Sequence, residues 1–555
     1  MARTISGNNT ASITLTSGDS PVTVTGTIDV AGAGALYGPA TGAPWTVTNS
    51  STGVITTGFI NGNGVSLASG SVVNAAGGTI SSTNTASGGT EMGDAVIIGG
   101  SSGGVGTIDN SGVLTNAAAG GPSFVAELDS SGSIINEASG TITGVSRGVG
   151  IRNDAATATV GSVTNLGTIT GTNTLGGSYG VAVIGGDVVS NGSGAVISNF
   201  GLGVGFVAYQ NTSPGTFSNA GTINDANGVN METGGAATNA VGGLITASGT
   251  GVIGASTLVN YGAISGGVDA VYMANFGLLV AESGSTLSGI VDGSGGTLEM
   301  GTGTGSVSDI TNFSTIAFDT GATAEVAGSA QALLDVTVTG FVTTDTLVIT
   351  GATNTISSFT GGMLVLGGTA PTTIDLGTVP GNPTATPNAG DTDITLVPCF
   401  RAGTRILTDA GEVAVERLKA GMRVVTCAGG REAAVTWVGH RRIDCARHPR
   451  PADVWPVRIA ADAFGAAMPH RPLYLSPDHA VFLNGELIPA RHLVNGASVR
   501  QVACEQVTYF HVELADHSVL LANGLPAESY LDTGNRALFA GETREPVEKT
   551  LSASA

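Results

Sequence analysis

The chain has 555 residues, including 88 glycines, and a formal net charge of −21 at pH 7. This length is sufficient for two or three hydrophobic cores. Residues 1–398 contain three basic and 24 acidic side chains, whereas residues 399–555 contain 17 of each. Because phosphate groups and anionic membranes are bound by clustered Lys and Arg, the acidic first part argues against nucleic acid or a membrane surface as its partner.

The first part contains a loose repeat, in which an aliphatic residue, any residue and Asn precede a Gly-containing spacer and a second aliphatic segment, as in VVNAAGGTIS and LVNYGAIS. The asparagines of this repeat are Asn49, Asn74, Asn110, Asn136, Asn165, Asn219, Asn239, Asn260 and Asn312, with a weaker member at Asn199. From Asn199 to Asn260 the spacing is 20, 20 and 21 residues. This period suits one turn of a parallel β-solenoid.

Val, Ile and Thr favour strands that can be buried between neighbouring coils, and Asn and Gly accept left-handed backbone conformations at corners. Stacked Asn side chains can also form a hydrogen-bonded ladder. We therefore predict an all-β, right-handed parallel β-solenoid over residues 1–367. Gly/Ser/Thr-rich disorder is less favoured, because regular aliphatic segments supply a core that disordered chains lack. Over about residues 20–365 the repeats resemble those of bacterial autotransporter passengers and other secreted β-helix adhesins.

An enzymatic solenoid would need clustered carboxylates, or a base with calcium and arginine, on one face. The acidic residues are dispersed along the sequence, and the basic ones are Arg3, Arg147 and Arg152. The segments GGVDAVYM and VDGSGGTLEM faintly resemble calcium-binding nonapeptides, but they are not in tandem, which favours plain corner turns. We interpret this part as an adhesive scaffold for a cell-surface or polysaccharide ligand. A polysaccharide-active β-helix enzyme is the weaker alternative.

Residues 368–395 contain four prolines and show no amphipathic period. Such a composition predicts an extended, exposed linker. The linker would make the junction with the following residues accessible.

Cys399 is the first cysteine of the chain and opens the segment CFRAGTRILTDAGEVAVERLKAGMRVVT. Two further segments follow, LYLSPDHAVFLNGELIPARHL and VTYFHVELADHSVLLANGLPAESYLDTGNR. In residue type and order these resemble three blocks of the Hint fold, which hedgehog autoprocessing domains and inteins share. The resemblance covers residues 396–536, is closest to a bacterial Hint subfamily, and implies a compact all-β horseshoe domain. Residues 537–555 would form a C-terminal tail.

The resemblance implies a catalytic role for three residues of this domain. Cys399 would attack the carbonyl of Pro398 and convert the peptide bond into a thioester. His479 would protonate the leaving amine. Ser476, at a position where Thr is usual, would bind the strained amide or the developing oxyanion with its hydroxyl. The order of the blocks favours these roles for Cys399 and His479 over those of buried structural residues.

Three further residues have less support. Asp478 would orient or activate an incoming nucleophile, or else cap its loop, and the sequence does not favour either role. His517 lies near the place where relatives carry an assisting group, although a surface position is favoured for it. His511 is also a weak candidate.

Inteins end in a His-Asn pair after a strand such as ANG, but Glu528 and Ser529 occupy these positions. Without an Asn side chain to cyclise, splicing is not expected. The predicted reaction is single-turnover cleavage before Cys399, with water or a small nucleophile as acyl acceptor, as hedgehog relatives use a sterol. The hindered carbonyl of Pro398 would slow interception of the thioester. The alternative is a structural or adhesive surface protein with an inert Hint-like domain.

No cofactor or metal is predicted, because His440, Cys445 and His448 in HRRIDCARH lack a fourth zinc ligand. The first 18 residues lack the apolar core of a Sec signal, and no run of 18 apolar residues occurs. The acidic, glycine-rich first part is typical of secreted bacterial surface proteins. We therefore expect a secreted or cell-surface bacterial protein without a membrane span, exported by a type I-like route without a cleaved signal peptide.

Overall fold

The computed structural model is all-β, as predicted. It describes residues 2–541 except 60–61, 84–92, 100–103, 118–122, 153–159, 175–176, 185, 208–212, 343–344, 361, 378–382, 397–398, 428–430, 448–450, 452–453, 478, 484–485, 516–517 and 531–539. Two compact units are present, one of residues 1–299 with 307–313 and one of residues 300–306 with 314–555. In the described ranges, no helix is long and apolar enough to cross a membrane.

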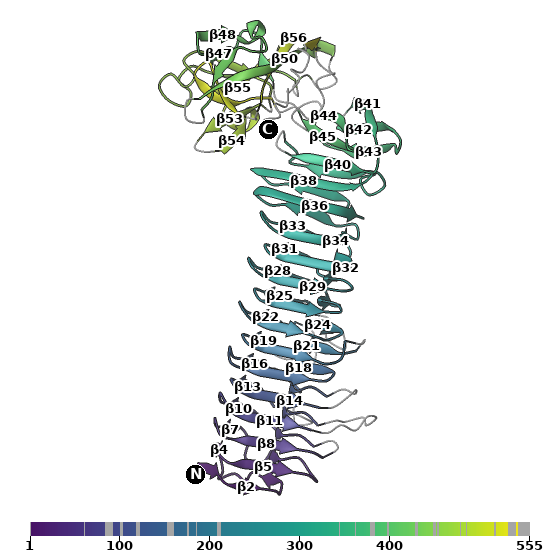
Figure 1. Cartoon of the computed structure of the whole chain (residues 1–555), viewed down its shortest axis with the longest axis vertical. Helices are drawn as coiled ribbons and strands as arrows, with labels where there is room; N and C mark the ends of the chain where they lie inside the picture. Colours follow the sequence, from purple (N-terminus) through teal and green to yellow (C-terminus); the bar gives the residue numbers. More distant parts are fainter. Residues whose placement is uncertain are drawn as a thin grey trace, which may run out of the picture. The chain divides into compact units, whose positions relative to one another are not determined.

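The first unit is a parallel β-solenoid in which three ladders of strands run from coil to coil (Figure 1). The first ladder consists of β1 (Arg3–Ile5), β4 (Val22–Val24), β7 (Trp45–Asn49), β10 (Gly70–Asn74), β13 (Gly106–Asn110), β16 (Gly132–Asn136), β19 (Ser162–Asn165), β22 (Val188–Asn191), β25 (Gly215–Asn219), β28 (Gly235–Asn239), β31 (Thr257–Asn260) and β33 (Leu278–Ala281). The second consists of β2 (Asn8–Asn9), β5 (Thr27–Val30), β8 (Val54–Thr57), β11 (Thr79–Ser82), β14 (Val113–Asn116), β17 (Thr141–Gly144), β20 (Thr168–Gly171), β23 (Val196–Ser198), β26 (Thr222–Asp225), β29 (Leu244–Ala247), β32 (Ala263–Tyr272) and β34 (Thr286–Asp292). The third consists of β3 (Ile13–Thr14), β6 (Leu36–Gly38), β9 (Val65–Leu67), β12 (Val96–Ile98), β15 (Ala126–Leu128), β18 (Arg147–Ile151), β21 (Tyr179–Ile184), β24 (Leu202–Val207), β27 (Val229–Met231) and β30 (Val252–Ile253). Two strands contain residues of both units, β35 (Thr297–Met300) and β36 (Gly303–Thr311).

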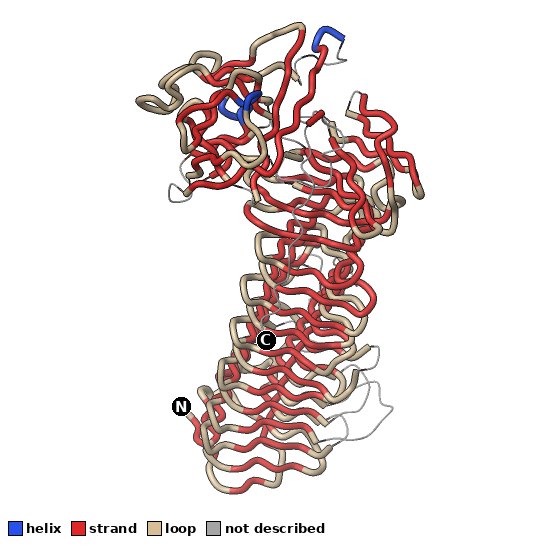
Figure 2. Tube along the Cα trace, turned by 45° about the horizontal axis from the view of Figure 1, so that its top comes forward, coloured by secondary structure: helices blue, strands red, loops and turns tan. Residues whose placement is uncertain are grey.

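The core of the solenoid follows from the alternation of side chains along each short strand, which points every second residue inward. The in-register pairing stacks these inward residues in columns. One column consists of Val22, Val47, Val72, Ile108, Ile134, Val163, Val189, Phe217, Ala237, Leu258 and Leu279. All of its members are buried. Figure 2 shows the coils stacked on one another with their strands in red.

The predicted asparagine ladder is present at the end of the first ladder of strands. Each Asn donates from Nδ2 to Oδ1 of the Asn in the next coil, at 2.8 to 2.9 Å, from Asn49 through to Asn260. The register explains where it ends. Val24 pairs with Asn49 in the preceding coil, and Ala281 pairs with Asn260 in the following one. The Oδ1 atom of Asn49 consequently has no hydrogen-bond partner among the described residues.

Two members of the predicted repeat lie outside the ladder, and one ladder position was missed. Asn191, in VVSNGSGAVIS, receives the bond from Asn165 and donates to Asn219. Asn199 is instead an exposed turn residue with φ of 65°. Asn312, with φ of 55°, donates to Asp292 at 2.7 Å. Both adopt the left-handed conformation that asparagine tolerates.

The second unit begins with further parallel pairs, β37 with β39 and β38 with β40. An antiparallel region follows. The strands of these two parts are β37 (Thr315–Phe318), β38 (Ala322–Ser329), β39 (Val336–Thr339), β40 (Thr346–Thr350), β41 (Asn354–Thr360), β42 (Met363–Gly368), β43 (Thr372–Asp375), β44 (Pro383–Asn388) and β45 (Asp391–Leu396).

This arrangement differs from the extended linker predicted over residues 368–395. β43 pairs with β39 and β42, and β45 pairs with β40 and β44. The segments TTID and DTDITL alternate Thr or Asp with aliphatic residues, a pattern that favours strands. The prolines dominated the prediction, yet Pro383 and Pro387 lie in β44, and strands at a sheet edge tolerate proline.

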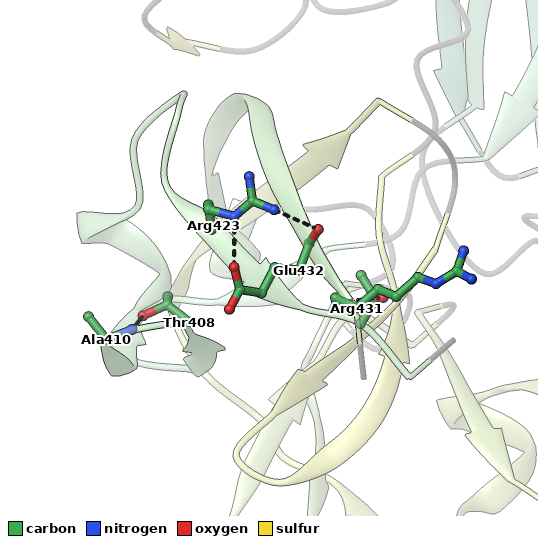
Figure 3. A network of polar contacts seen from close by, with 6 residues as sticks. Thr408, Ala410, Arg423, Arg431 and Glu432 are labelled. Carbon is green, nitrogen blue, oxygen red and sulfur yellow. Dashed lines mark hydrogen bonds and ion pairs between the residues drawn. The ribbon is translucent and has the colours of Figure 1, made fainter. Parts of the chain in front are cut away.

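The C-terminal domain is a compact set of antiparallel strands with short 3-10 turns. Its elements are β46 (Phe400–Arg401), β47 (Arg405–Thr408), β48 (Gly411–Ala414), η2 (Val415–Arg417), β49 (Arg423–Val425), β50 (Glu432–Asp444), η3 (Cys445–Arg447), β51 (Val457–Ile459), β52 (Leu473–Leu475), β53 (Ala480–Leu483), β54 (Glu486–Pro489), η5 (Ala490–Leu493), β55 (Val499–Gln501), β56 (Gln506–Leu514), β57 (Val519–Ala522), β58 (Leu525–Glu528) and β59 (Ala540–Gly541). Its core is mostly aliphatic and includes Ile406, Val424, Val457, Leu473 and Val512. On the surface, Arg423 donates to Glu432 at 2.8 Å between β49 and β50 (Figure 3).

Candidate functional site

Strand register brings the start of the C-terminal domain against two distant segments. Phe400 on β46 pairs antiparallel with Leu475 on β52 and with Phe510 on β56. In an antiparallel pair the residue before one partner lies opposite the residue after the other. Cys399 therefore lies opposite Ser476 and His511. These three polar residues come together although more than a hundred positions separate the first from the last.

The contacts of Cys399 agree with this register. Its backbone N–H donates to Oγ of Ser476 at 3.0 Å, and its carbonyl oxygen accepts from the backbone N–H of Ser476 at 2.9 Å. Its sulfur lies 3.6 Å from Nε2 of His511. The amide nitrogen of the bond between residues 398 and 399 is thus fixed by a hydroxyl. The thiol faces an imidazole that can accept its proton when Nε2 carries no hydrogen.

His479 directly precedes β53, its backbone N–H donates to the carbonyl of Ser476, and it is almost fully buried. Its Nε2 is 3.1 Å from the carbonyl oxygen of Glu528. Because a carbonyl only accepts, Nε2 carries the hydrogen and Nδ1 has the lone pair. Nδ1 is buried and makes no hydrogen bond within the part of the chain that the structure describes.

Burial lowers the pKa of His479 to about 4, against the opposing effects of the Glu528 carboxylate and the backbone of Cys399. Desolvation penalises the charged imidazolium, which is the general reason for such a shift. His479 is therefore neutral at pH 7. Its environment includes the backbone of Cys399.

Two aromatic rings pack against His511. The Trp437 ring is stacked on the His511 ring with centroids 6.4 Å apart, and Tyr530 meets His511 edge-on at 5.3 Å. Trp437 fits because position 439 is glycine. A Cβ at Gly439 would lie 1.9 Å from the Trp437 ring. The glycine thus allows the ring to cover the strand and shield His511 from water.

One comparison with known proteins identifies the family of the C-terminal domain. Residues 398–534 match the family model of the Hint domain. The chain carries a Hint domain. Among solved structures, it is similar to the bacterial intein-like domain from Clostridium thermocellum, solved in solution, with 17% identity, 24% of this chain and 98% of that chain covered, and a TM-score of 0.19. No curated protein matches the chain.

The predicted site residues of the Hint domain are brought together in part. Cys399, Ser476 and His479 converge as described above. Pro398, Asp478 and His517 lie outside the described residues, so their predicted roles stay predictions. His511, a weak candidate from its sequence context, contacts the thiol. Its signal was a lone imidazole within the apolar strand YFHVEL, but the pairing of β46 with β56 was needed to interpret it.

Glu528 and Ser529, which replace the His-Asn pair of inteins, are both buried in the Hint domain. One oxygen of the Glu528 carboxyl group accepts the backbone N–H of Ala480 at 2.6 Å. Ser529 accepts the backbone N–H of Ser518 with its hydroxyl at 2.9 Å. These two side chains hold the strand ends that position His479.

Some charged side chains that are dispersed along the sequence lie close together in the solenoid. Glu127 on β15 forms an ion pair with Arg152, and burial raises the pKa of Glu127 to about 7. Burial and the charge of Glu127 raise the pKa of Asp94. The Arg147 guanidinium lies 5.3 Å from the centroid of the Phe124 ring. Because both carboxyl groups are buried, we interpret this cluster as a clamp between coils.

Proposed function

We propose that the Hint domain cleaves its own chain before Cys399 by an N-to-S acyl shift, without splicing. Residues 1–398 then pass to water or to a small nucleophile. The observation that carries this proposal is the joint placement of the Cys399 thiol against His511 and of the Cys399 amide against Ser476. A nucleophile beside a base, and a leaving nitrogen held by a hydroxyl, are the two requirements of the first step.

The first step begins at the sulfur. His511 takes the thiol proton at Nε2, and the thiolate attacks the carbonyl carbon of Pro398. A carbon–sulfur bond forms and the carbonyl oxygen becomes negatively charged. The Trp437 and Tyr530 rings limit water around His511, which strengthens the attraction between the imidazolium and the charge that develops nearby.

The second step breaks the carbon–nitrogen bond. The nitrogen of Cys399 has to gain a proton, because an amide anion is a very poor leaving group. The Ser476 hydroxyl is in contact with this nitrogen, and His479 lies beside the Cys399 backbone. With a pKa of about 4, only about one His479 in a thousand is protonated at pH 7. His479 therefore has to take up at Nδ1 the proton that His511 received from the thiol before it can pass this proton to the Cys399 nitrogen.

Hydrolysis of the thioester completes the reaction. Water adds to the thioester, the carbon–sulfur bond breaks, and the products are a Pro398 carboxylate and a free Cys399 with a new amino group. Cyclisation at the C-terminal side has no support, because Glu528 and Ser529 stand where inteins have His and Asn. One carboxyl oxygen of Glu528 moreover accepts a hydrogen bond from the backbone N–H of Ala480.

For the solenoid we propose a scaffold that is displayed outside the cell and holds an adhesive surface. Its acidic composition and its regular, ladder-stabilised coils support this role. A polysaccharide-active enzyme has less support, because the carboxyl groups of Asp94 and Glu127 are buried. The inert Hint-like domain remains the alternative to self-cleavage.

The test is the intact mass of the full chain over several days, with and without dithiothreitol, for the wild type and for Cys399→Ala. Cys427→Ala is the matched control, because Cys427 is a partly exposed thiol on another edge of the same domain. A fragment ending at Pro398 should appear in the wild type and in Cys427→Ala, grow faster with thiol and be missing in Cys399→Ala. A wild type that stays intact in dithiothreitol supports the inert alternative.

A further inference from the structure

Two cysteines that the proposed mechanism does not use lie in contact. The sulfur atoms of Cys445 and Cys504 are 3.7 Å apart. Cys445 starts η3 directly after β50, and Cys504 lies two residues before β56. The last register pair of these strands, Asp444 with Gln506, explains the contact. Continued by one residue, this register places Cys445 opposite Glu505, so that Cys504 is its diagonal neighbour.

The backbone around both cysteines is held in place. Beyond the last strand pair, the N–H of Ala446 donates to the carbonyl of Glu505 at 3.1 Å. The indole N–H of Trp455 donates to the carbonyl of Cys504, also at 3.1 Å. A disulfide requires sulfur atoms about 2 Å apart and Cα atoms close enough to be bridged. Here the sulfur atoms have to approach by rotation of the side chains, while the backbone stays in place.

We propose that Cys445 and Cys504 form an internal disulfide by exchange with a small-molecule disulfide. Cys504 is the partly exposed member and Cys445 is buried. Cys504 therefore attacks the external disulfide, forms a mixed disulfide and releases one small thiol. Cys445 then attacks the Cys504 sulfur and expels the second small thiol. Two protein thiols are oxidised and one external disulfide is reduced, so the electrons balance.

The location of the pair gives the disulfide a function. Cys445 packs with Val454, Val507 and Tyr509, and Cys399 and Cys504 lie against this cluster. In an oxidising environment, neighbouring thiols would compete to trap Cys399 as a disulfide. Once Cys445 and Cys504 are bonded to each other, neither remains as a free thiol that an oxidant could join to Cys399. This consequence rests on the proposed function, whereas the disulfide itself does not.

The experiment uses the full chain, incubated with oxidised glutathione, alkylated and mapped by peptide mass spectrometry without reduction. We expect one linked peptide pair containing Cys445 and Cys504, with Cys399 and Cys427 alkylated. The midpoint of thermal unfolding should rise by about 5 to 10 °C on oxidation. Cys504→Ser should lose the linked peptide and the shift, whereas Cys427→Ser should keep both.

Linkage of Cys399 to Cys445 or Cys504 would overturn the proposal, and so would glutathione adducts on Cys504 without an internal link. The wild-type peptide map alone decides this, even where a serine variant does not fold. Cys399→Ala separates the two proposals, because it cannot cleave itself. If this variant still forms the internal disulfide, the disulfide proposal holds even if the wild type does not cleave itself.

Discussion

The sulfur of Cys399 lies 3.6 Å from Nε2 of His511, on a strand that is paired directly with the first strand of the domain. In the proposed mechanism this contact makes His511 the proton acceptor of the thiol and leaves His479 for the later proton transfer. His511 is next to the thiol, whereas His479 is next to the Cys399 backbone and the Glu528 carbonyl. We therefore propose that the two imidazoles serve different steps of the cleavage.

Replacement of His511 should slow the formation of the thioester. In His511→Ala the thiol loses its proton acceptor, and we expect thiol-induced cleavage to slow by about 10²-fold or more, within the usual range for a general base. The rate is measured from intact mass in dithiothreitol. His440→Ala is the matched control, because His440 is an exposed histidine on β50. Equal rates in both variants would remove His511 from the mechanism.

The buried His479 should make the Hint domain sensitive to acid. Its pKa is about 4 when folded, against about 6.5 when unfolded, so the unfolded chain binds more protons between these values. Stability should rise with pH from 4 to 6.5 and be lost as the pH falls, by on the order of 3 kcal/mol in total. Denaturant unfolding of the wild type and of His479→Gln at pH 4.5 and 7 measures this. An unchanged pH dependence in the variant would contradict the assignment.

The buried Asp225 in the solenoid should affect the pH dependence of stability in the opposite direction to His479. Burial raises its pKa to about 7, while the backbone N–H of Phe200 donates to it. Because the folded chain binds the proton more tightly, this group's stability contribution is present at low pH and lost as the pH rises through 7. Asp225→Asn keeps the acceptor and should stabilise the solenoid at pH 8 by about 2 to 4 kcal/mol. Asp29→Asn, at an exposed strand position, should change the unfolding midpoint very little.

The asparagine ladder should be essential to the stacking of coils. Asn165→Ala removes the acceptor for Asn136 and the donor for Asn191, so that each of these two buried amides loses one hydrogen bond. We expect a loss of about 2 to 4 kcal/mol, measured by denaturant unfolding. Asn199→Gly is the control, because Asn199 is exposed with φ of 65°, a conformation that glycine adopts freely. Similar losses in both variants would mean that the ladder adds nothing.

The sequence predicted those features that depend on local pattern. The coil period, the ladder and the positions of Cys399, Ser476 and His479 each follow from short motifs. The pairing partner of a strand is not local information. His511 therefore received less weight than His517, since only the register of β46 with β56 brings it to the thiol.

Two other differences have the same origin. Asn191 and Asn199 both follow an aliphatic residue and a serine, and only the register of β22 with β25 assigns the ladder position to Asn191. The prolines after Gly368 indicated a linker, but pairing of β45 with β40 adds this segment to a sheet. Tertiary pairing overrides local propensity at each of these places.

The central claim is that the bond before Cys399 passes through a thioester, and hydroxylamine tests it most directly. The wild-type chain is incubated with hydroxylamine at neutral pH, and the C-terminal peptide of the released fragment is identified by mass spectrometry. The account predicts a hydroxamate at Pro398 in the wild type and in Cys427→Ala, and none in Cys399→Ala. A chain that stays intact at this bond, or equal cleavage at this bond in Cys399→Ala, would contradict it.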